Sequence, residues 1–264
     1  MTKTQVDTAA LLDLAMRGAR AAGAELMARY GHIQGLDTKT SATDPVSDAD
    51  RAAEAILVNL ITDERPDDGL LGEEGAARES RSGLRWVIDP LDGTVNYLYQ
   101  LDNFSVSVAV EDADGALVGV VHNPTNGRTY RAVRGGGAGV AGHTLHVNDP
   151  VPLERALIAT GFGYSAEVRA AQGALVAGLL PKVRDIRRIG SAALDLCAVA
   201  AGAVDGYFEE GVKAWDVAAG GLIAREAGAS YAVISPTGAQ TGCLAAGPAL
   251  FRELQHELRP LRKA

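Results

Sequence analysis

The chain has 264 residues, of which 47% are hydrophobic and 22% are charged, and its net charge is −8. These values are typical of a globular protein with a substantial core, and they exclude a disordered chain. An acidic chain without a long basic run argues against nucleic acid as the main partner. The N-terminal stretch MTKTQVDTAA lacks the apolar core of a signal peptide, and no apolar run is long enough to span a bilayer. We therefore expect a cytoplasmic protein that does not bind a membrane.

Two helices and a series of strands are predicted in the first half. Apolar residues at helical spacing predict a helix over residues 7–30, and Ser47 is the candidate N-cap of a second helix over 47–64. The polar, turn-rich segment 31–47 between them is expected to be a long loop of the kind that often carries function. Short strands are predicted at 69–72, 85–89, 104–111, 116–122 and 128–133.

Strands and helices alternate in the second half. Strands are predicted at 157–160, 183–189, 204–209, 230–234 and 243–246, and helices at 166–180, 191–201, 215–227 and the C-terminus. Antiparallel strands followed by βα units indicate a mixed α and β fold, which we expect to be a layered αβαβα sandwich with two β-sheets covered by helices. The sequence Asn148-Asp149-Pro150 marks a division into an N-terminal α+β half, 1–148, and a C-terminal α/β half, 149–264, within one compact unit.

Two glycine-containing motifs are interpreted as turns. GAGVAG, residues 137–142, matches G-x-G-x-x-G, but the HTLHVND that follows alternates like a strand, whereas the dinucleotide motif requires a helix there. DADG, residues 112–115, has its glycine at the wrong position for a calcium loop and no glutamate to close one. We expect a glycine-rich hairpin at the first motif and a hairpin turn at the second.

The segment WVIDPLDGTVNY places two aspartates at the end of an apolar run. Turn formation explains Asp92-Gly93 but not Asp89, because a charge at the end of a buried strand is costly without a partner. Pro90 keeps Asp89 out of helical geometry, so we expect Asp89 at the end of the strand. Asp92-Gly93-Thr94 can open a short helix whose backbone N–H groups meet an anion. The segment favours metal-assisted phosphate chemistry, since Mg²⁺ takes carboxylate and phosphate oxygens together.

Other acidic residues fit the same chemistry. They are Glu73 and Glu74 after an apolar strand in LLGEEG, Asp48 and Asp50 at a helix start in VSDAD, and Asp216 in KAWDVAAG. Each one alone has an ordinary structural explanation, such as N-capping of the following helix by Asp216. Their presence together with the two aspartates of WVIDPLDGTVNY indicates one shared site.

The ordered series GEE, DPLDGT and WD resembles the inositol monophosphatase family of Mg²⁺-dependent, lithium-sensitive phosphatases. The likeness continues in KTSATDPVSDAD, TGFGYS and IRRIGSAALDLCAVAAGAVDGYFEEGVKAWDVAAG, and it runs over nearly the whole chain. One departure is Gly228-Ala229, where the family pattern commonly has Gly-Gly; this position is a helix end and leaves the proposed ligands intact. The resemblance implies a phosphoric monoester hydrolase in which an activated water attacks in line, a homodimer, and a place near the interface for Arg187.

The resemblance also implies a set of metal ligands for two or three Mg²⁺ ions. The activating ion would be surrounded by Glu73, Asp89, the backbone carbonyl of Leu91, and Thr94. A second ion would be held by Asp89, Asp92 and Asp216. A third, more weakly bound ion would depend on Glu73 alone.

The remaining site residues follow from the same resemblance. Glu73 and Thr94, with Asp50 behind them, would position the attacking water, and Lys39 on the loop would face the phosphate. Phosphate-binding amides would come from Gly93 and Thr94. The alcohol part of the substrate would be contacted by Gly190, Ser191, Ala192, Glu209 and Asp216.

The identity of the substrate depends on the alcohol part of the site. We expect inositol 1-phosphate, with histidinol phosphate or another small sugar phosphate as the alternative. Glu209 can accept hydrogen bonds from two hydroxyl groups or pair with the ammonium group of histidinol phosphate, so its presence does not choose between them. A non-catalytic metal- or phosphate-binding protein is the remaining alternative. Loss of Glu73, Thr94 or Asp216 would favour it, and all three are present.

Overall fold

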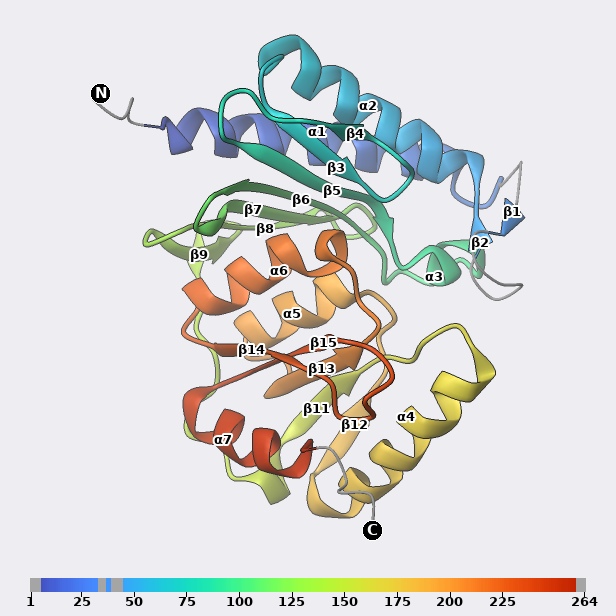
Figure 1. Ribbon diagram of the computed structural model, residues 1–264, viewed down its shortest axis with the longest axis vertical. Coiled ribbons are helices and arrows are strands. Elements are labelled where there is room, and N and C mark those ends of the chain that lie inside the picture. Colours follow the sequence, from blue (N-terminus) through green and yellow to red (C-terminus); the bar gives the residue numbers. More distant parts are fainter. Residues whose placement is uncertain (1–5, 33–36, 39–44, 260–264) are drawn as a thin grey trace.

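The computed structural model describes residues 6–32, 37–38 and 45–259 (Figure 1). Helices and two β-sheets alternate in layers along the long axis of the molecule (Figure 1). The outer layers are α1 (Thr8–Arg29) with α2 (Asp48–Glu64) at one end and α4 (Ala166–Leu179) with α7 (Pro248–Glu257) at the other. The layer between the sheets contains α5 (Ala192–Ala200) and α6 (Ala214–Glu226). The predicted αβαβα sandwich is confirmed.

Side chains cap the starts of the first two helices, and one of these caps, Ser47, was predicted. Asp7 accepts the backbone N–H groups of Ala9 and Ala10, each at 3.1 Å, at the start of α1. Ser47 and Asp50 form a capping box at the start of α2, in which Ser47 N donates to Asp50 Oδ2 at 2.9 Å. None of the helices in the described ranges has the length and apolar character needed to cross a membrane.

The larger sheet has the strand order β10-β9-β8-β7-β6-β5-β3-β4. Its strands are β3 (Gly69–Gly72), β4 (Ala77–Arg78), β5 (Arg85–Asp92), β6 (Ser105–Asp112), β7 (Gly115–Asn123), β8 (Arg128–Val133), β9 (Gly137–Val140) and β10 (His143–Thr144). Strands β3 and β5 run parallel, and the other neighbours run antiparallel. Buried side chains of α1 and α2 pack on one face, and those of α5 and α6 pack on the other.

Both glycine-containing motifs form hairpins. Strands β6 and β7 join at Asp112–Gly115, where Asp114 N donates to Asp112 Oδ1 at 2.8 Å. In GAGVAG the first four residues are β9, and β10 follows as its antiparallel partner. A second short pair, β1 (Asp37–Thr38) with β2 (Pro45–Val46), lies in the segment predicted as a loop.

The smaller sheet has the strand order β12-β11-β13-β15-β14. Its strands are β11 (Leu157–Thr160), β12 (Asp185–Arg187), β13 (Gly206–Glu210), β14 (Ser230–Ile234) and β15 (Gly242–Ala246). The predicted strand 183–189 is shortened to β12: a 3-10 helix at Leu180–Lys182 precedes it, and the chain turns at Gly190, whose φ is +97°, before α5. The boundary between the halves 1–148 and 149–264 stays a prediction.

Strand β5 does not end at Asp89, and this part of the prediction is wrong. The strand continues to Asp92, and its pairing with β6 shifts between Asp89, opposite Ser107, and Asp92, opposite Ser105. Pro90 has no N–H to donate to the neighbouring strand, which accounts for the irregularity. Residues three apart in a regular strand point to opposite faces. Because of the irregularity, Asp89 and Asp92 instead line the same pocket.

Candidate active site

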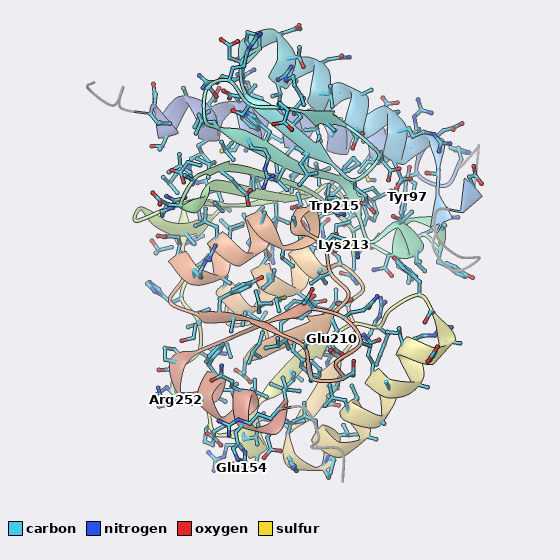
Figure 2. The ribbon with its side chains drawn as sticks, viewed as in Figure 1. Tyr97, Glu154, Glu210, Lys213, Trp215 and Arg252 are labelled. Carbon is cyan, nitrogen blue, oxygen red and sulfur yellow. The ribbon has the colours of Figure 1, made fainter. Side chains whose placement is uncertain are left out.

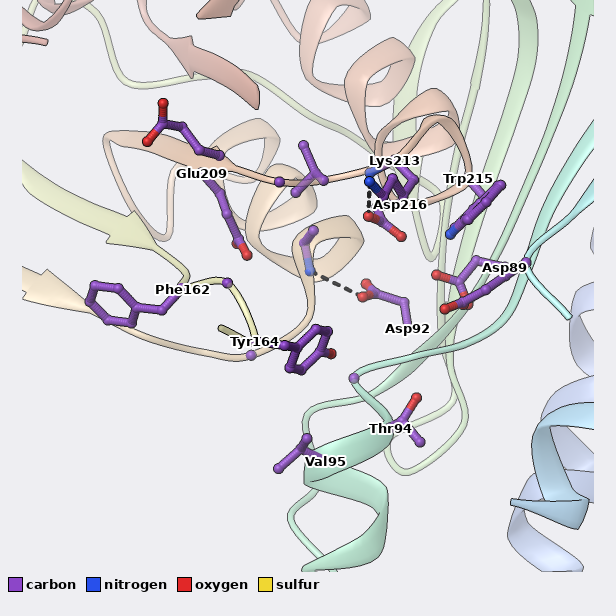
Figure 3. Close-up of a pocket in the computed structure, with 18 of the residues that line it drawn as sticks. Asp89, Asp92, Thr94, Val95, Phe162, Tyr164, Glu209, Lys213, Trp215 and Asp216 are labelled. Atoms are coloured by element: carbon purple, nitrogen blue, oxygen red, sulfur yellow. Dashed lines mark hydrogen bonds between the residues drawn. The ribbon is translucent and has the colours of Figure 1, made fainter. Parts of the chain in front are cut away.

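A pocket of about 850 Å³ is lined by residues that come from two separate stretches of the chain, 73–95 and 162–240. It is bordered by the loop after β3, the end of β5, the segment before α4, the end of β13 and the first turns of α5 and α6. Lys213 and Trp215 mark the start of α6 beside it (Figure 2). Asp89, Asp92 and Asp216 lie around one region of the pocket, and Phe162 and Tyr164 lie across from them (Figure 3).

Asp89 is almost completely buried at the pocket floor. Its Oδ1 accepts the N–H of Leu91 at 3.0 Å, which closes a tight turn inside the β5 irregularity. Burial raises the pKa of Asp89 well above its usual range. The nearby carboxylates of Glu73, Asp92 and Asp216 raise that pKa further, and a hydrogen bond with Glu73 acts in the same direction. The Asp89 carboxyl group therefore faces other acids.

Asp92 is held by the first turn of α5. Its carboxylate accepts hydrogen bonds from Ser191 Oγ at 2.5 Å and from the backbone N–H of Ala193 at 2.8 Å. Burial raises the pKa of Asp92 to about 6, although these two hydrogen bonds lower it. From the sequence, Ser191 was predicted only to contact the alcohol part of the substrate, and its direct bond to Asp92 was not foreseen.

Asp216 occupies the first turn of α6 and has a structural partner. Its Oδ2 accepts the N–H of Lys213 at 2.6 Å, so Asp216 is the third residue of the helix and Lys213, not Asp216, is the N-cap residue. Burial nevertheless raises the pKa of Asp216 well above its usual range, and Asp92 raises it further. The capping bond therefore leaves Asp216 with unfavourable contacts to the other acids.

Glu73 follows β3 directly, and its N–H donates to Ile88 O at 3.2 Å. Glu54 of α2, which the sequence reasoning missed, holds this loop: its carboxylate accepts the N–H groups of Glu74 at 2.9 Å and Ala76 at 3.0 Å. Nothing in the local sequence distinguishes Glu54 from other helix-surface acids.

Thr94 begins the short helix α3 (Thr94–Leu98), as predicted. Its hydroxyl lies 3.1 Å from Leu91 O and 3.3 Å from Asp50 Oδ1. Thr94 thus contacts both Leu91 and Asp50, two of the residues that the resemblance grouped with it around the attacking water and the first ion. Gly93 is the N-cap with a φ of +96°, a conformation that favours glycine.

The segment Gly190–Ala192 lies against the start of α3. A Cβ built on Gly93 would come within 3.1 Å of Gly190 O, so close contact between the two segments requires glycine. Asn96, which the sequence reasoning missed, links them by donating from Nδ2 to Ile189 O at 2.8 Å. The predicted phosphate-side and alcohol-side residues are therefore neighbours in the fold.

Glu209 lies at the end of β13 on the opposite side of the pocket from Asp89. Tyr207 donates its hydroxyl to Glu209 Oε2 at 2.9 Å. Burial raises the pKa of Glu209 to about 7, although Tyr207 and the guanidinium of Arg188 lower it. A Cβ at Gly161 would collide with the Glu209 carboxylate, so glycine in TGFG leaves the space that this carboxylate occupies.

Acidic side chains dominate the lining of the pocket. Among the described residues seven acids line it, Glu73, Glu74, Asp89, Asp92, Glu209, Glu210 and Asp216, against two bases, Arg188 and Lys213. Carboxylate oxygens are the ligands that Mg²⁺ prefers, and buried carboxylates with raised pKa values are stabilised by a bound cation. As the side chains lie, no three His, Cys, Asp or Glu residues in the described ranges form a closed set of metal ligands. Asp92 and Asp216 are turned toward backbone donors instead. The residue types and their burial fit a divalent cation.

The structure places the predicted site residues that it describes close to one another; one predicted residue is not among them. Lys39 lies outside the described residues. Arg188, Lys213 and Gln240 also line the pocket and were not singled out from the sequence. Each is an ordinary polar residue in its local sequence, so no local signal marks it.

Comparison with known proteins identifies the family. Residues 7–260 match the inositol monophosphatase family. The chain belongs to this family. Its relatives include the Nus factor SuhB of Pasteurella multocida, which is 40% identical over 258 residues that cover 95% of this chain and 96% of that protein. The inositol-1-monophosphatase of Mycobacterium bovis is 38% identical over 275 residues, covering 96% and 95% respectively.

Solved structures of inositol monophosphatase relatives share the fold. The extragenic suppressor protein suhB of Bartonella henselae superposes with a TM-score of 0.87 at 34% identity, covering 97% of this chain and 99% of that one. The inositol monophosphatase of Anabaena (Nostoc) superposes with a TM-score of 0.81 at 31% identity and covers 96% of each chain. The family resemblance read from the sequence motifs is confirmed.

Proposed function

We propose that this protein is a Mg²⁺-dependent phosphate monoester hydrolase of the inositol-1-monophosphatase type. The observation that carries the proposal is the charge of the pocket, where seven acids face two bases among the described residues. A phosphate monoester dianion is repelled by such a surface, and cations held by the acids reverse that repulsion. Membership of the inositol monophosphatase family supports the same reaction class.

The acids near β5 are the proposed metal ligands. The first ion would be held by Glu73, Asp89, the carbonyl of Leu91, and Thr94. A second ion would be held by Asp89, Asp92 and Asp216. A third ion would depend on Glu73 alone. Bound Mg²⁺ supplies positive charge to the phosphate oxygens and lowers the pKa of a water molecule.

The chain itself positions the reactants. Thr94 Oγ1 lies 3.3 Å from Asp50 Oδ1, so Asp50 can orient the Thr94 hydroxyl toward the attacking water. Glu73 is the proposed base that holds this water in line with the phosphorus atom. The N–H groups of Gly93 and Thr94 at the start of α3 bind the phosphate, and Lys39 faces it from the loop. No covalent intermediate is required.

The alcohol group of the substrate is proposed to bind beyond the phosphate, between the start of α5 and the end of β13. Gly190, Ser191 and Ala192 form one side, with Asp216 near the bridging oxygen, and Glu209 lies on the other side. Glu209 accepts hydrogen bonds from hydroxyl groups of inositol 1-phosphate, which is the preferred substrate in this proposal. Histidinol phosphate is the alternative, since its ammonium group would pair with the ionised carboxylate.

Phosphate release from both esters, with and without Mg²⁺, tests the proposal. We expect Mg²⁺-dependent turnover with a higher kcat/KM for inositol 1-phosphate. The Glu209→Gln variant keeps some capacity to bind hydroxyl groups and loses the ion pair. The substitution should lower kcat/KM slightly for inositol 1-phosphate and strongly for histidinol phosphate. A wild-type preference for histidinol phosphate that is lost in Glu209→Gln would change the substrate and leave the reaction class standing.

Lithium inhibition is a further part of the proposal. Li⁺ would enter the site of Asp89, Asp92 and Asp216 after turnover and retain phosphate, so inhibition should be uncompetitive with substrate. The measurement is the initial rate across a Li⁺ titration at moderate Mg²⁺. Rates that do not change would contradict this assignment of the second ion.

A non-catalytic role is the second candidate function. It is favoured by the name Nus factor, which relatives carry at the same level of identity as relatives named inositol-1-monophosphatase. The phosphatase assay separates the two, because a protein with only a Nus-factor role would release no phosphate from any ester.

The proposed protein is a cytoplasmic homodimer whose main partner is a small phosphate ester, with Arg187 near the interface. Light scattering of wild type and Arg187→Ala tests that assembly.

A further inference from the structure

Tyr207 precedes Glu209 on the same face of β13. Residues two apart in a strand project from the same side of the sheet, and for these two residues that side is the one that packs against α5. Tyr207 shares a core cluster with Ala192 and Leu196 of that helix. The next side chain on this face, Glu209, reaches the wall of the pocket. The strand therefore places a core residue next to a pocket residue.

The ring of Tyr207 is held between small residues. Strand β13 runs between β11 and β15, where Ala159 and Ala245 are the register partners of Tyr207. Both alanines belong to the same core cluster, so their side chains leave room for the ring on the face toward α5. Tyr207 is completely buried. A ring packed on all sides keeps one position, so its hydroxyl is a fixed point behind the pocket.

The hydroxyl of Tyr207 has one acceptor among the residues that the structure describes, and this acceptor is Glu209 Oε2 at 2.9 Å. A buried hydroxyl without a partner is costly, so the bond is favoured on the side of Tyr207. It is also favoured on the side of Glu209, because a hydrogen bond to a carboxylate stabilises the ionised form. The bond accordingly lowers the pKa of Glu209, which burial raises to about 7.

The two carboxylate oxygens of Glu209 have different surroundings. Oε2 accepts from Tyr207, and the carboxylate lies against Gly161, where a Cβ would collide with it. Oε1 has no hydrogen-bond partner in the described part of the chain, and it is not among the fully buried atoms that lack one. It is therefore open to the pocket, which Glu209 lines across from Asp92 (Figure 3). An ionised oxygen in this place accepts a hydrogen bond from a donor on a bound ligand.

We propose that Tyr207 is a positioning residue that holds the Glu209 carboxylate so that Oε1 meets a hydroxyl group of the leaving alcohol. The inference rests on the proposed phosphatase function and deepens its account of the alcohol side of the site. The terminal torsion of a glutamate is broad, so a carboxylate without this bond samples more orientations. Fixing it before the substrate binds removes an ordering cost from association. Tyr207 thus contributes to substrate binding without touching the substrate.

Kinetics of Tyr207→Phe on two esters test this role, because phenylalanine keeps the ring and removes the hydroxyl. For inositol 1-phosphate with Mg²⁺ we expect KM to rise about 3- to 10-fold with kcat nearly unchanged, since the weakened contact acts equally in the ground and transition states. Phenyl phosphate has no hydroxyl group to donate to Glu209, so its kcat/KM should change less than about twofold. Tyr97→Phe is the matched control. Tyr97 is also completely buried, and its hydroxyl donates to Leu26 O at 2.7 Å, so the variant should leave KM unchanged for both esters.

A double-mutant cycle with Glu209→Ala separates positioning from a general structural effect. The Glu209→Ala protein has no carboxylate for the hydroxyl to hold. Adding Tyr207→Phe to it should therefore change KM for inositol 1-phosphate less than about twofold. A structural effect of Tyr207 on the pocket as a whole would multiply KM by the same factor with and without the Glu209 carboxylate, and that result would contradict the proposal.

The outcomes separate the role of Tyr207 from the proposed function. If wild type hydrolyses both esters with Mg²⁺ and Tyr207→Phe affects them equally, or affects neither, the positioning role is wrong and the phosphatase function stands. If wild type hydrolyses neither ester with Mg²⁺, the proposed function is wrong, and the role of Tyr207 toward a leaving alcohol is wrong with it.

Discussion

The carboxylate of Asp92 accepts the Ser191 hydroxyl at 2.5 Å, although 99 residues separate the two in the chain. Ser191 Oγ also accepts the N–H of Leu194 at 3.2 Å, so one hydroxyl caps α5 and fixes a proposed metal ligand. The bond joins the end of β5 to the helix layer between the sheets. Asp92 therefore has a structural role in the protein without metal, in addition to any role as a ligand.

Ser191→Ala should affect both stability and the titration of Asp92. Loss of the cap and of the bond to a buried carboxylate should lower the free energy of unfolding by about 1–3 kcal/mol. The Ser191 hydrogen bond lowers the pKa of Asp92, which is about 6 in the intact protein, so its removal raises that pKa. The acid limb of the pH–rate profile should then move to higher pH. Asp7→Ala removes the cap of α1, far from the pocket, and should cost stability without moving that limb. An unmoved limb in Ser191→Ala would contradict the assignment of Asp92.

Asp89→Asn tests the proposed metal site without relying on turnover. Burial and the carboxylates of Glu73, Asp92 and Asp216 raise the pKa of Asp89, so a neutral Asn relieves unfavourable interactions in the protein without metal. The variant should unfold at the same or a higher temperature than wild type in chelator. Saturating Mg²⁺, at about 100 times its Kd, should stabilise wild type by about 2.7 kcal/mol and the variant hardly at all. Phosphatase activity of the variant should fall at least about 100-fold.

The matched control for that measurement is Asp114→Asn, the same change on an exposed residue of the β6–β7 turn. It should keep both activity and the Mg²⁺-dependent shift in melting temperature. An undiminished shift in Asp89→Asn would show that the ion binds elsewhere.

Local patterns in the sequence were sufficient for most elements and for the set of acids. Ser47 with Asp50 is a capping signal that lies within four residues, and the structure forms that capping box. The continuation of β5 to Asp92 was missed, because it depends on pairing with Ser105 of another strand. Gln240 was missed for a similar reason, since its position follows from bonds between its loop and the end of β13. Features set by contacts between distant segments leave no mark in the local sequence.

Gly161→Ala should disturb the alcohol side of the pocket through Glu209. The added methyl group would collide with the Glu209 carboxylate and displace it. We expect KM for inositol 1-phosphate to rise roughly tenfold or more, as for a lost hydrogen bond to a charged group, and stability to fall by about 1–3 kcal/mol. Gly173→Ala is the matched control, because a Cβ there meets no atom within 4 Å. Alanine at this position in α4 should leave KM unchanged and raise stability by up to about 1 kcal/mol. Equal KM values for wild type and Gly161→Ala would remove Glu209 from the substrate contacts.

Glu209 should also make the stability of the protein depend on pH. Burial raises its pKa in the folded state to about 7 from an ordinary value of 4.5. The folded state therefore binds the proton more tightly than the unfolded state. The stability that this group contributes is fully present below about pH 4.5 and is lost as pH rises through about 7.

Glu209→Gln is permanently neutral, so it lacks this titration and should become more stable than wild type as pH rises. The difference in unfolding free energy should be near its minimum at pH 5 and should grow to at most about 3 kcal/mol by pH 8. Urea unfolding of both proteins without Mg²⁺ at these two pH values measures this difference in unfolding free energy. Glu253→Gln, on the exposed face of α7, should follow wild type at both pH values. The difference in unfolding free energy between Glu209→Gln and wild type could instead stay constant with pH. That result would show that the Glu209 carboxylate is ionised throughout this range. The side chain would then be better hydrated than its place beside Gly161 and Tyr207 implies.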